Sequence, residues 1–219
     1  MVMRNATIPV MLFFLLCMFQ GSVQGRHLLS SGPGIRPKPD DAAHFARWLV
    51  SQSFWGDLST IESDLGGAPF GLEEVTEGKF YQLCPYFQAE VSFSDGTPDK
   101  GTGIPYFYLT LLDPTARNAL KDQRSSFTLS EYSLGTCGKT DPENPTCAKI
   151  TLTGKLKMVD GKSSEAKYAL TALFSKHPEM KDWPKDHNFQ IFKLDIEDIF
   201  LINWFGGRKP LTVDQYLHA

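Results

Sequence analysis

The chain has 219 residues, of which 42% are hydrophobic and 21% are charged, so its composition is that of an ordinary globular protein with one sizeable core. The formal net charge at pH 7 is −3, and the lysines and arginines are scattered without a basic run. These features give no reason to expect nucleic acid or an acidic membrane as a partner. We therefore expect no nucleic-acid binding.

The N-terminus has the pattern of a secretory signal peptide. One cation, Arg4, precedes an apolar run of about a dozen residues, and the small residues Val23 and Gly25 precede a cleavage point at Arg26. The run is short for a spanning helix, which needs roughly twenty apolar residues, so a retained signal anchor is the less favoured alternative. We expect the mature protein to enter the secretory pathway without membrane insertion after cleavage, and to end outside the cell or in an endolysosomal or vacuolar compartment.

A Gly/Pro-rich segment, 26–39, follows the cleavage point and is predicted to be an extended, mobile lead-in. Asp40 and Asp41 then offer N-caps to a helix that ends at about Gln52. Its apolar face is predicted from three residues at helical spacing, which are Phe45, Trp48 and Leu49.

Most of the remaining chain is rich in β-branched and aromatic residues, which favours strands. The expected strands are 57–62, 81–93, 104–112, 125–134, 148–159 and 189–205. Alternation that buries one face of a sheet is clearest at Ile150, Leu152, Gly154, Leu156 and Met158. Helices are expected at 115–122, at 164–176 and at 213–217. This pattern predicts a β-barrel of the α+β class with peripheral helices, in a single domain over 40–219 after the signal peptide (1–25) and the lead-in (26–39).

Three cysteines follow the signal peptide, which itself contains Cys17. Cys137 and Cys147 flank a loop of turn-forming residues, so a local disulfide is expected in an oxidising compartment, where it would contribute roughly 2–3 kcal/mol. Cys84 is left over. It is either buried as a small apolar group, which we favour, or exposed and able to pair between chains. No CxxC pair occurs, so neither a structural zinc site nor thioredoxin-type chemistry is indicated.

Five motifs resemble, in order, those of the CREG family of secreted "cellular repressor" glycoproteins. They are WGDLSTI (55–61), APFG (68–71), GTGIPYFYLT (101–110), KHPEMKDWPKDHNF (176–189) and WFGGRKPLTVDQY (204–216). The resemblance covers about 41–217, and the family carries a similarly spaced cysteine pair. It implies a split β-barrel of the flavin-binding kind, as in pyridoxamine 5′-phosphate oxidases, that dimerises through the barrel face. Characterised members are regarded as ligands without flavin or catalysis, in which loops and the dimer contact fill the flavin space.

The chain departs from the animal members in two respects. Its Asn-x-Ser/Thr sequon, at Asn5, lies in the signal peptide, and Asn144 is followed by a forbidden proline, so no N-glycan is expected on the mature chain. Without that glycan, glycan-dependent sorting or receptor binding is not expected. The second difference is the stretch TEGKFYQLCPYFQAEV (76–91), which contains Cys84 and is interpreted as an insertion relative to the short animal members.

A candidate FMN phosphate site lies between 112 and 129, where QRSSFTL resembles the strand entry of flavin-binding split barrels. Cations and hydroxyls there could hold a phosphate, with Arg124 making a bidentate contact. The candidate residues are Arg117, Lys121, Arg124, Ser125 and Ser126. The alternative, which we favour, is that the cations form the solvated face of a short helix and its exit.

The stretch SKHPEMKDWPKDHNF (175–189) gathers histidines and acids, yet it lacks the spacing of a metal site and is interrupted by prolines. We predict a structural turn in which Trp183 caps the barrel and the histidines form local hydrogen bonds, and we expect no metal. The residues weighed for the metal site are His177, Glu179, Asp182, Asp186 and His187.

Other catalytic readings lack support. No GxSxG elbow occurs, and GTGIPYFYL is not a dinucleotide-binding GxGxxG. Tyr106, Phe107 and Tyr108 are predicted to pack the barrel and a dimer interface. The favoured hypothesis is a homodimeric, non-catalytic binding or regulatory module with an unknown protein partner and no cofactor. An FMN-dependent oxidoreductase of the pyridoxamine 5′-phosphate oxidase type is the alternative, and a barrel that binds heme or another tetrapyrrole is a distant third.

Overall fold

The computed structural model describes residues 34–62, 68–71, 90–98 and 100–219, and Pro33–Ala219 form one compact unit. The expected signal peptide, Cys84 and nearly all of the expected insertion lie outside the described residues. Among the residues that are described, no helix is long and apolar enough to cross a membrane.

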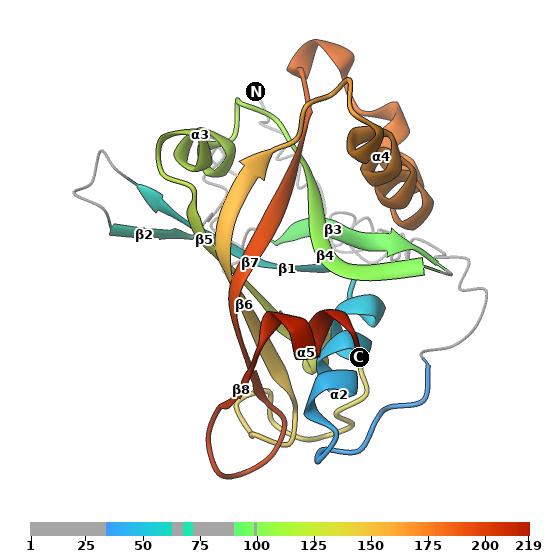
Figure 1. Cartoon of the computed structure of the whole chain (residues 1–219), viewed down its shortest axis with the longest axis vertical. Helices are drawn as coiled ribbons and strands as arrows, with labels where there is room; N and C mark the ends of the chain where they lie inside the picture. Colours follow the sequence, from blue (N-terminus) through green and yellow to red (C-terminus); the bar gives the residue numbers. More distant parts are fainter. Residues whose placement is uncertain (1–33, 63–67, 72–89, 99) are drawn as a thin grey trace, which may run out of the picture. The chain divides into compact units, whose positions relative to one another are not determined.

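The fold is built on a closed antiparallel barrel, as Figure 1 shows. The strands follow one another round the ring in the order β1–β3–β4–β7–β6–β5, and β5 pairs with β1 to close it. Short strands extend the sheet at β1 and β7. The bounds are β1 (Trp55–Glu62), β2 (Ala68–Gly71), β3 (Val91–Thr97), β4 (Lys100–Leu109), β5 (Arg124–Ser130), β6 (Lys149–Met158), β7 (Gln190–Ile202) and β8 (Lys209–Leu211). The β-barrel predicted from the sequence is confirmed.

The barrel interior is filled by alternate side chains of its strands. The rings of Phe93 and Phe107 each pack edge-on against that of Phe127, with centroids 4.8 Å and 5.0 Å apart. On β6 the predicted alternation holds over most of the strand, and Ile150 is fully buried. It fails at Met158, which is 50% exposed because β6 ends there.

In the described part of the chain, four α-helices lie around the barrel: α2 (Ala42–Gln52), α3 (Pro114–Lys121), α4 (Ser164–Lys176) and α5 (Val213–Leu217). The predicted apolar face of α2 is buried, with Phe45 and Leu49 fully covered. Helix α4 covers the outside of β3 and β4, where Tyr106 packs against it. Phe107 points the other way, into the barrel, since neighbouring side chains alternate along a strand.

The described part of the predicted lead-in, residues 34–39, contacts helix α2. Gly34 accepts a hydrogen bond from the indole N–H of Trp48 at 2.8 Å, and Arg36 stacks over the ring of Phe45 at 4.7 Å. Asp41 occupies the N-cap position of α2, as predicted, but its carboxylate lies 2.9 Å from the ring of His44 and makes no hydrogen bond to the backbone of the first turn.

The predicted strand 125–134 is wrong in its second half. Strand β5 ends at Ser130, and residues Glu131–Leu134 form the 3-10 helix η3. The Ser130 side chain accepts a hydrogen bond from the N–H of Tyr132, and Gly135 ends the turn with a φ of 71°. A buried carboxylate at Glu131 holds this turn against the next strand, and its contacts are described below.

Candidate functional site

Helix α3 and the start of β5 position the residues predicted to bind an FMN phosphate. Asp113 begins α3, and its Oδ1 accepts a hydrogen bond from the backbone N–H of Thr115 at 2.7 Å. The helix ends at Lys121 and β5 starts at Arg124, so these two cations and Arg117 are exposed on one short stretch. Arg117 and Lys121 share a helix face because they are four residues apart.

Both arginines of this stretch are engaged by oxygens of their own segment. Arg117 Nη1 donates to the backbone carbonyls of Leu112 at 2.8 Å and Leu111 at 3.2 Å. Arg124 donates from Nε to Asp122 Oδ1 at 3.0 Å and from Nη2 to Oδ2 at 2.5 Å. These hydrogen bonds lower the pKa of Asp122 to about 2. The donor fork that would suit a phosphate is thus turned onto a neighbouring carboxylate.

The two serines point to opposite faces of β5, because side chains alternate along a strand. Ser125 is buried, and its hydroxyl donates to the carbonyl of Gln123 at 3.1 Å. Ser126 is half-buried on the opposite face of the strand. One phosphate cannot contact both hydroxyls from these positions, so the five residues do not converge into a clamp. FMN binding stays a prediction that this geometry does not favour.

The buried side of α3 carries polar residues that the sequence analysis missed. Asn118 Nδ2 donates to Thr60 Oγ1 at 3.4 Å and ties the helix to β1. Thr115 Oγ1 is buried and has no hydrogen-bond partner among the described residues. Their spacing in the sequence could have indicated this, because Thr115 and Asn118 are three residues apart and therefore share a helix face, and they lie beside the buried Ala116 and Ala119.

The stretch from His177 to Phe189 lies on the outside of the barrel. His177 is buried, and its Nε2 donates to the carbonyl of Phe93 at 2.9 Å, in a strand 84 residues earlier. The prediction of local hydrogen bonds is therefore wrong for this histidine. Its Nδ1 lies 3.8 Å from Glu179. Within the described part of the chain, no three His, Cys, Asp or Glu side chains are placed to hold a metal ion.

Trp183 belongs to an aromatic cluster and does not cap the barrel. Its ring stacks on Tyr108 with centroids 6.0 Å apart and planes at 21°, and Phe189 lies 4.9 Å from it. Tyr108 faces outward, because the preceding residue, Phe107, fills the barrel. The exposed ring of His187 lies 6.2 Å from that of Phe189. The stretch thus fixes α4 and the following turns against β4.

The GTGIPY motif also has a packing role. Gly103 has a φ of 81°, and a Cβ there would lie 2.2 Å from Arg47 Nη1. Arg47 Nη2 donates to the carbonyl oxygen of Gly101 at 2.7 Å. The hydroxyl of Tyr216 donates to the carbonyl oxygen of Gly103, also at 2.7 Å. The glycine therefore lets α2 and α5 approach β4.

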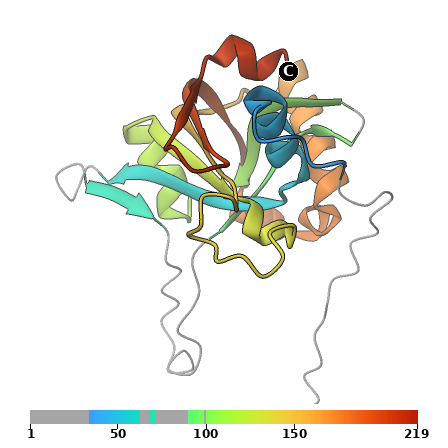
Figure 2. The same ribbon diagram turned by 90° about the horizontal axis from the view of Figure 1, so that it is seen from below.

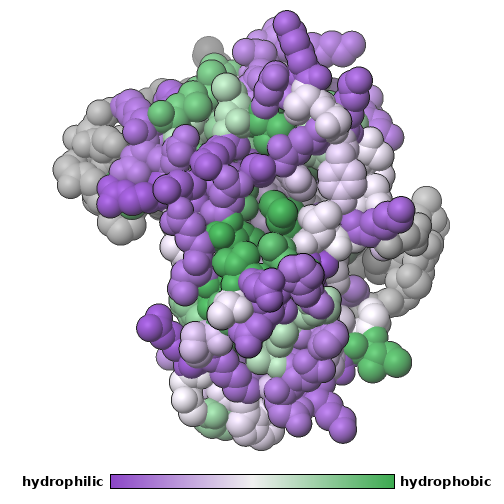
Figure 3. All heavy atoms as spheres, in the orientation of Figure 1, coloured by the Kyte–Doolittle hydropathy of each residue, from purple (hydrophilic) through white to green (hydrophobic). Residues whose placement is uncertain are grey.

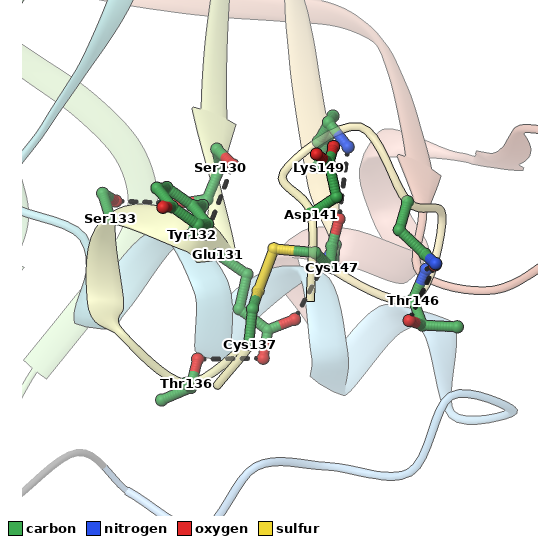
Figure 4. The surroundings of a disulfide bond; sticks show 12 residues. Ser130, Glu131, Tyr132, Ser133, Thr136, Cys137, Asp141, Thr146, Cys147 and Lys149 are labelled. Atoms are coloured by element: carbon green, nitrogen blue, oxygen red, sulfur yellow. Dashed lines mark hydrogen bonds between the residues drawn. A yellow bond between two sulfur atoms is a disulfide. The ribbon is translucent and has the colours of Figure 1, made fainter. Parts of the chain in front are cut away.

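The predicted disulfide between Cys137 and Cys147 is confirmed, with Cα atoms 5.3 Å apart. Figure 4 shows the carboxylate of Glu131 beneath it, accepting a hydrogen bond from Thr136 at 2.9 Å. Glu131 is fully buried, and it binds Arg36 through both oxygens, at 2.5 Å and 2.9 Å. The local sequence pattern could not predict this ion pair, because Arg36 and Glu131 are 95 positions apart.

Burial by itself would raise the pKa of Glu131. Hydrogen bonds from the side chain of Arg36, the backbone N–H of Ala148 and the hydroxyl of Thr136 outweigh that effect, and the pKa lies below its usual value. The carboxylate therefore stays charged at neutral and mildly acidic pH, and it joins the start of the described chain to the disulfide loop.

Comparisons with known proteins agree with this architecture. The family model described as "CREG, beta-barrel" matches residues 84–218. Protein CREG1 of Gallus gallus is 36% identical over 193 residues, which covers 85% of this chain and 90% of that protein. Protein CREG1 of Homo sapiens is 35% identical over 185 residues, covering 84% and 76%. Protein CREG2 of Homo sapiens is 34% identical over 206 residues, covering 92% of this chain and 63% of that protein.

Among solved structures, a heme binding protein from Mycobacterium smegmatis matches with a TM-score of 0.60 at 17% identity, covering 84% of this chain and 62% of that one. A protein of unknown function from Agrobacterium tumefaciens matches with a TM-score of 0.57 at 20% identity, covering 85% and 64%. Both show the fold, a split β-barrel of the pyridoxamine 5′-phosphate oxidase-like type. Taken with the sequence identities, the chain belongs to the CREG family.

Proposed function

We propose that this chain is a secreted or endolysosomal homodimer that acts as a non-catalytic binding or regulatory module. The observation that carries the proposal is the engagement of Arg117 and Arg124 by the chain's own oxygens. A phosphate clamp needs N–H groups that are open to the ligand. Here an incoming phosphate would have to displace Asp122 from Arg124, and Ser125 points away from it.

The sequence and the disulfide support passage through the secretory pathway. The first 25 residues have the pattern of a signal peptide, and the bond between Cys137 and Cys147 suits an oxidising compartment. Expression of the full chain in a eukaryotic secretory host tests this part. We expect the protein in the medium or in acidic vesicles, with a mature N-terminus at Arg26. Retention in the cytosol would contradict it.

An apolar area supports homodimerisation. Figure 3 shows hydrophobic side chains gathered at the middle of one face, in the region where Figure 1 draws β7 above α5. Contiguous apolar surface on a secreted protein is commonly covered by a partner, and self-association in a closed pair is the commonest way to cover it. Light scattering of the purified protein at micromolar concentration should give twice the chain mass. A monomer would contradict the proposal.

Titration with FMN tests the absence of a flavin cofactor. We expect no saturable quenching of flavin fluorescence by the wild-type protein. The variant Asp122→Asn releases Arg124 and should gain affinity, whereas the exposed control Asp186→Asn should not. Stoichiometric FMN binding by the wild type that is lost in Arg124→Ala would instead support the oxidoreductase alternative. A saturable Soret band on titration with hemin would support the tetrapyrrole alternative.

A further inference from the structure

An aromatic pair stands out at the loop between β7 and β8. Trp204 is 51% exposed and Phe205 is 62% exposed, and their rings pack edge-on with centroids 6.3 Å apart. Large aromatic side chains are normally covered by the chain that carries them. Two exposed aromatic side chains next to each other on a loop indicate an interaction surface for a protein, a ligand or a membrane.

The loop has a fixed base and an open tip. At the base, Asn203 Nδ2 and Lys209 Nζ both donate to the carbonyl of Pro39, at 2.9 Å and 2.7 Å. At the tip, Gly206 and Gly207 have φ values of 114° and 88°, and a Cβ at either position would meet no described atom within 4 Å. The two rings are therefore presented outward on a short, anchored turn.

The loop is basic as well as aromatic. The stretch from Asn203 to Leu211 contains Arg208 and Lys209 and no acidic residue, although the whole chain has a net charge of −3. Arg208 is exposed, and its guanidinium lies 5.7 Å over the ring of Phe200. Tyr132, which is 51% exposed, lies in the segment 131–148. Figures 1 and 2 both place that segment beside the β7–β8 loop at the same end of the barrel.

We propose that the β7–β8 loop binds the surface of membranes that contain anionic phospholipid. Tryptophan prefers the membrane–water interface, where its ring enters the headgroup layer while its N–H stays hydrated. Phe205 would add apolar area beside it, and the exposed Arg208 would lie against lipid phosphates and carboxylates, while Lys209 stays bound to Pro39 at the base of the loop. The contact would be peripheral and reversible, since the loop is too short to reach across a bilayer. It would hold a secreted barrel at a lipid surface without a spanning segment.

Vesicle co-sedimentation tests this proposal. The protein secreted by a eukaryotic host is mixed with vesicles of phosphatidylcholine alone, or with phosphatidylcholine containing about one third phosphatidylserine. We expect binding to the anionic vesicles only. The double variant Trp204→Ser/Phe205→Ser should reduce the partition coefficient by about tenfold or more, and Arg208→Ala by a few-fold. The matched control is Leu112→Ser, at an apolar side chain that is 64% exposed on another loop.

A second readout locates the contact. Insertion of Trp204 should shift its emission to the blue and expose it to quenchers carried on lipid chains, and this signal should be lost in Trp204→Phe. Far-UV circular dichroism checks that each variant folds. The proposal is overturned if the wild type fails to bind anionic vesicles, if it binds both kinds of vesicle equally, or if the double variant binds as well as the wild type. It is also overturned if the double variant changes a dimer into a monomer, because the loop would then cover a second copy.

Discussion

Replacing Glu131 by glutamine should weaken the fold although the side chain keeps its shape. The carboxylate is fully buried and accepts four hydrogen bonds, two from Arg36, one from Thr136 at 2.9 Å and one from the N–H of Ala148 at 3.0 Å. A glutamine can offer one acceptor oxygen, and its amide N–H₂ would face at least one of these donors. The variant thus loses charge-assisted bonds and leaves a buried donor without an acceptor.

The size of the expected loss in the free energy of unfolding follows from the burial of the Glu131–Arg36 ion pair. Breaking a fully buried ion pair costs about 3–5 kcal/mol. The Arg36 side chain is 35% exposed, so water takes over part of the lost interaction and the lower end of that range, about 3 kcal/mol, applies. For a chain of this size that loss lowers the melting temperature by about 6–12 °C.

Thermal unfolding followed by circular dichroism measures this loss. The matched control is Glu143→Gln, because Glu143 is exposed in the same disulfide loop and should change the melting temperature by about 1 °C or less. The pKa of Glu131 lies below its usual value of 4.5, so its contribution is fully present above pH 4.5 and is lost as the pH falls below it. A melting temperature for Glu131→Gln equal to that of Glu143→Gln at pH 6 would refute the reasoning.

Three further variants test other parts of the structure. Replacing both Cys137 and Cys147 by serine should cost roughly 2–3 kcal/mol in the free energy of unfolding, and reduction of the wild type with dithiothreitol should lower its stability toward that of the variant. Gly103→Ala should lower the free energy of unfolding by about 2 kcal/mol or more, because a φ of 81° is strained for alanine and the added Cβ would meet Arg47. The control is Gly135→Ala, where the φ of 71° is similar but the Cβ would enter open space. An equal loss in both variants would assign the effect to backbone strain alone. Burial lowers the pKa of Lys176 to about 8 from 10.5, so the unfolded chain binds more protons between these values and stability should rise with pH across that window. In urea titrations Lys176→Met should remove this rise, and an unchanged slope would show that Lys176 has an ordinary pKa.

The regular parts of the fold could be predicted because local patterns determine them. Helix α4 runs from Ser164 to Lys176 as expected, since Ser163 caps it and a proline follows it. Strands β6 and β7 follow from their alternation and their β-branched residues. Family resemblance, rather than periodicity, supplied the split-barrel topology, because a strand pattern does not say which strands pair.

What could not be predicted depends on contacts between distant segments. The Gly/Pro content of the lead-in does not indicate that Arg36 pairs with Glu131, 95 positions away. The expected strand ends at Ser130, where the Ser130 side chain caps a 3-10 helix, and the Glu131 carboxylate binds the N–H of Ala148, which precedes β6. In the candidate phosphate site the decisive contact is local instead, because Asp122, two residues before Arg124, occupies the donors of its guanidinium. Only the three-dimensional arrangement shows which partner each cation takes.

The visible absorption spectrum of the protein purified from a eukaryotic secretory host is the first measurement to make, because it shows directly whether the barrel carries a flavin or a heme. We expect a spectrum without flavin or Soret bands that stays unchanged after incubation with excess FMN and removal of the unbound flavin. Twin flavin bands that are released on denaturation, in an amount equal to the protein, would contradict this expectation and would make Arg124 the first residue to replace.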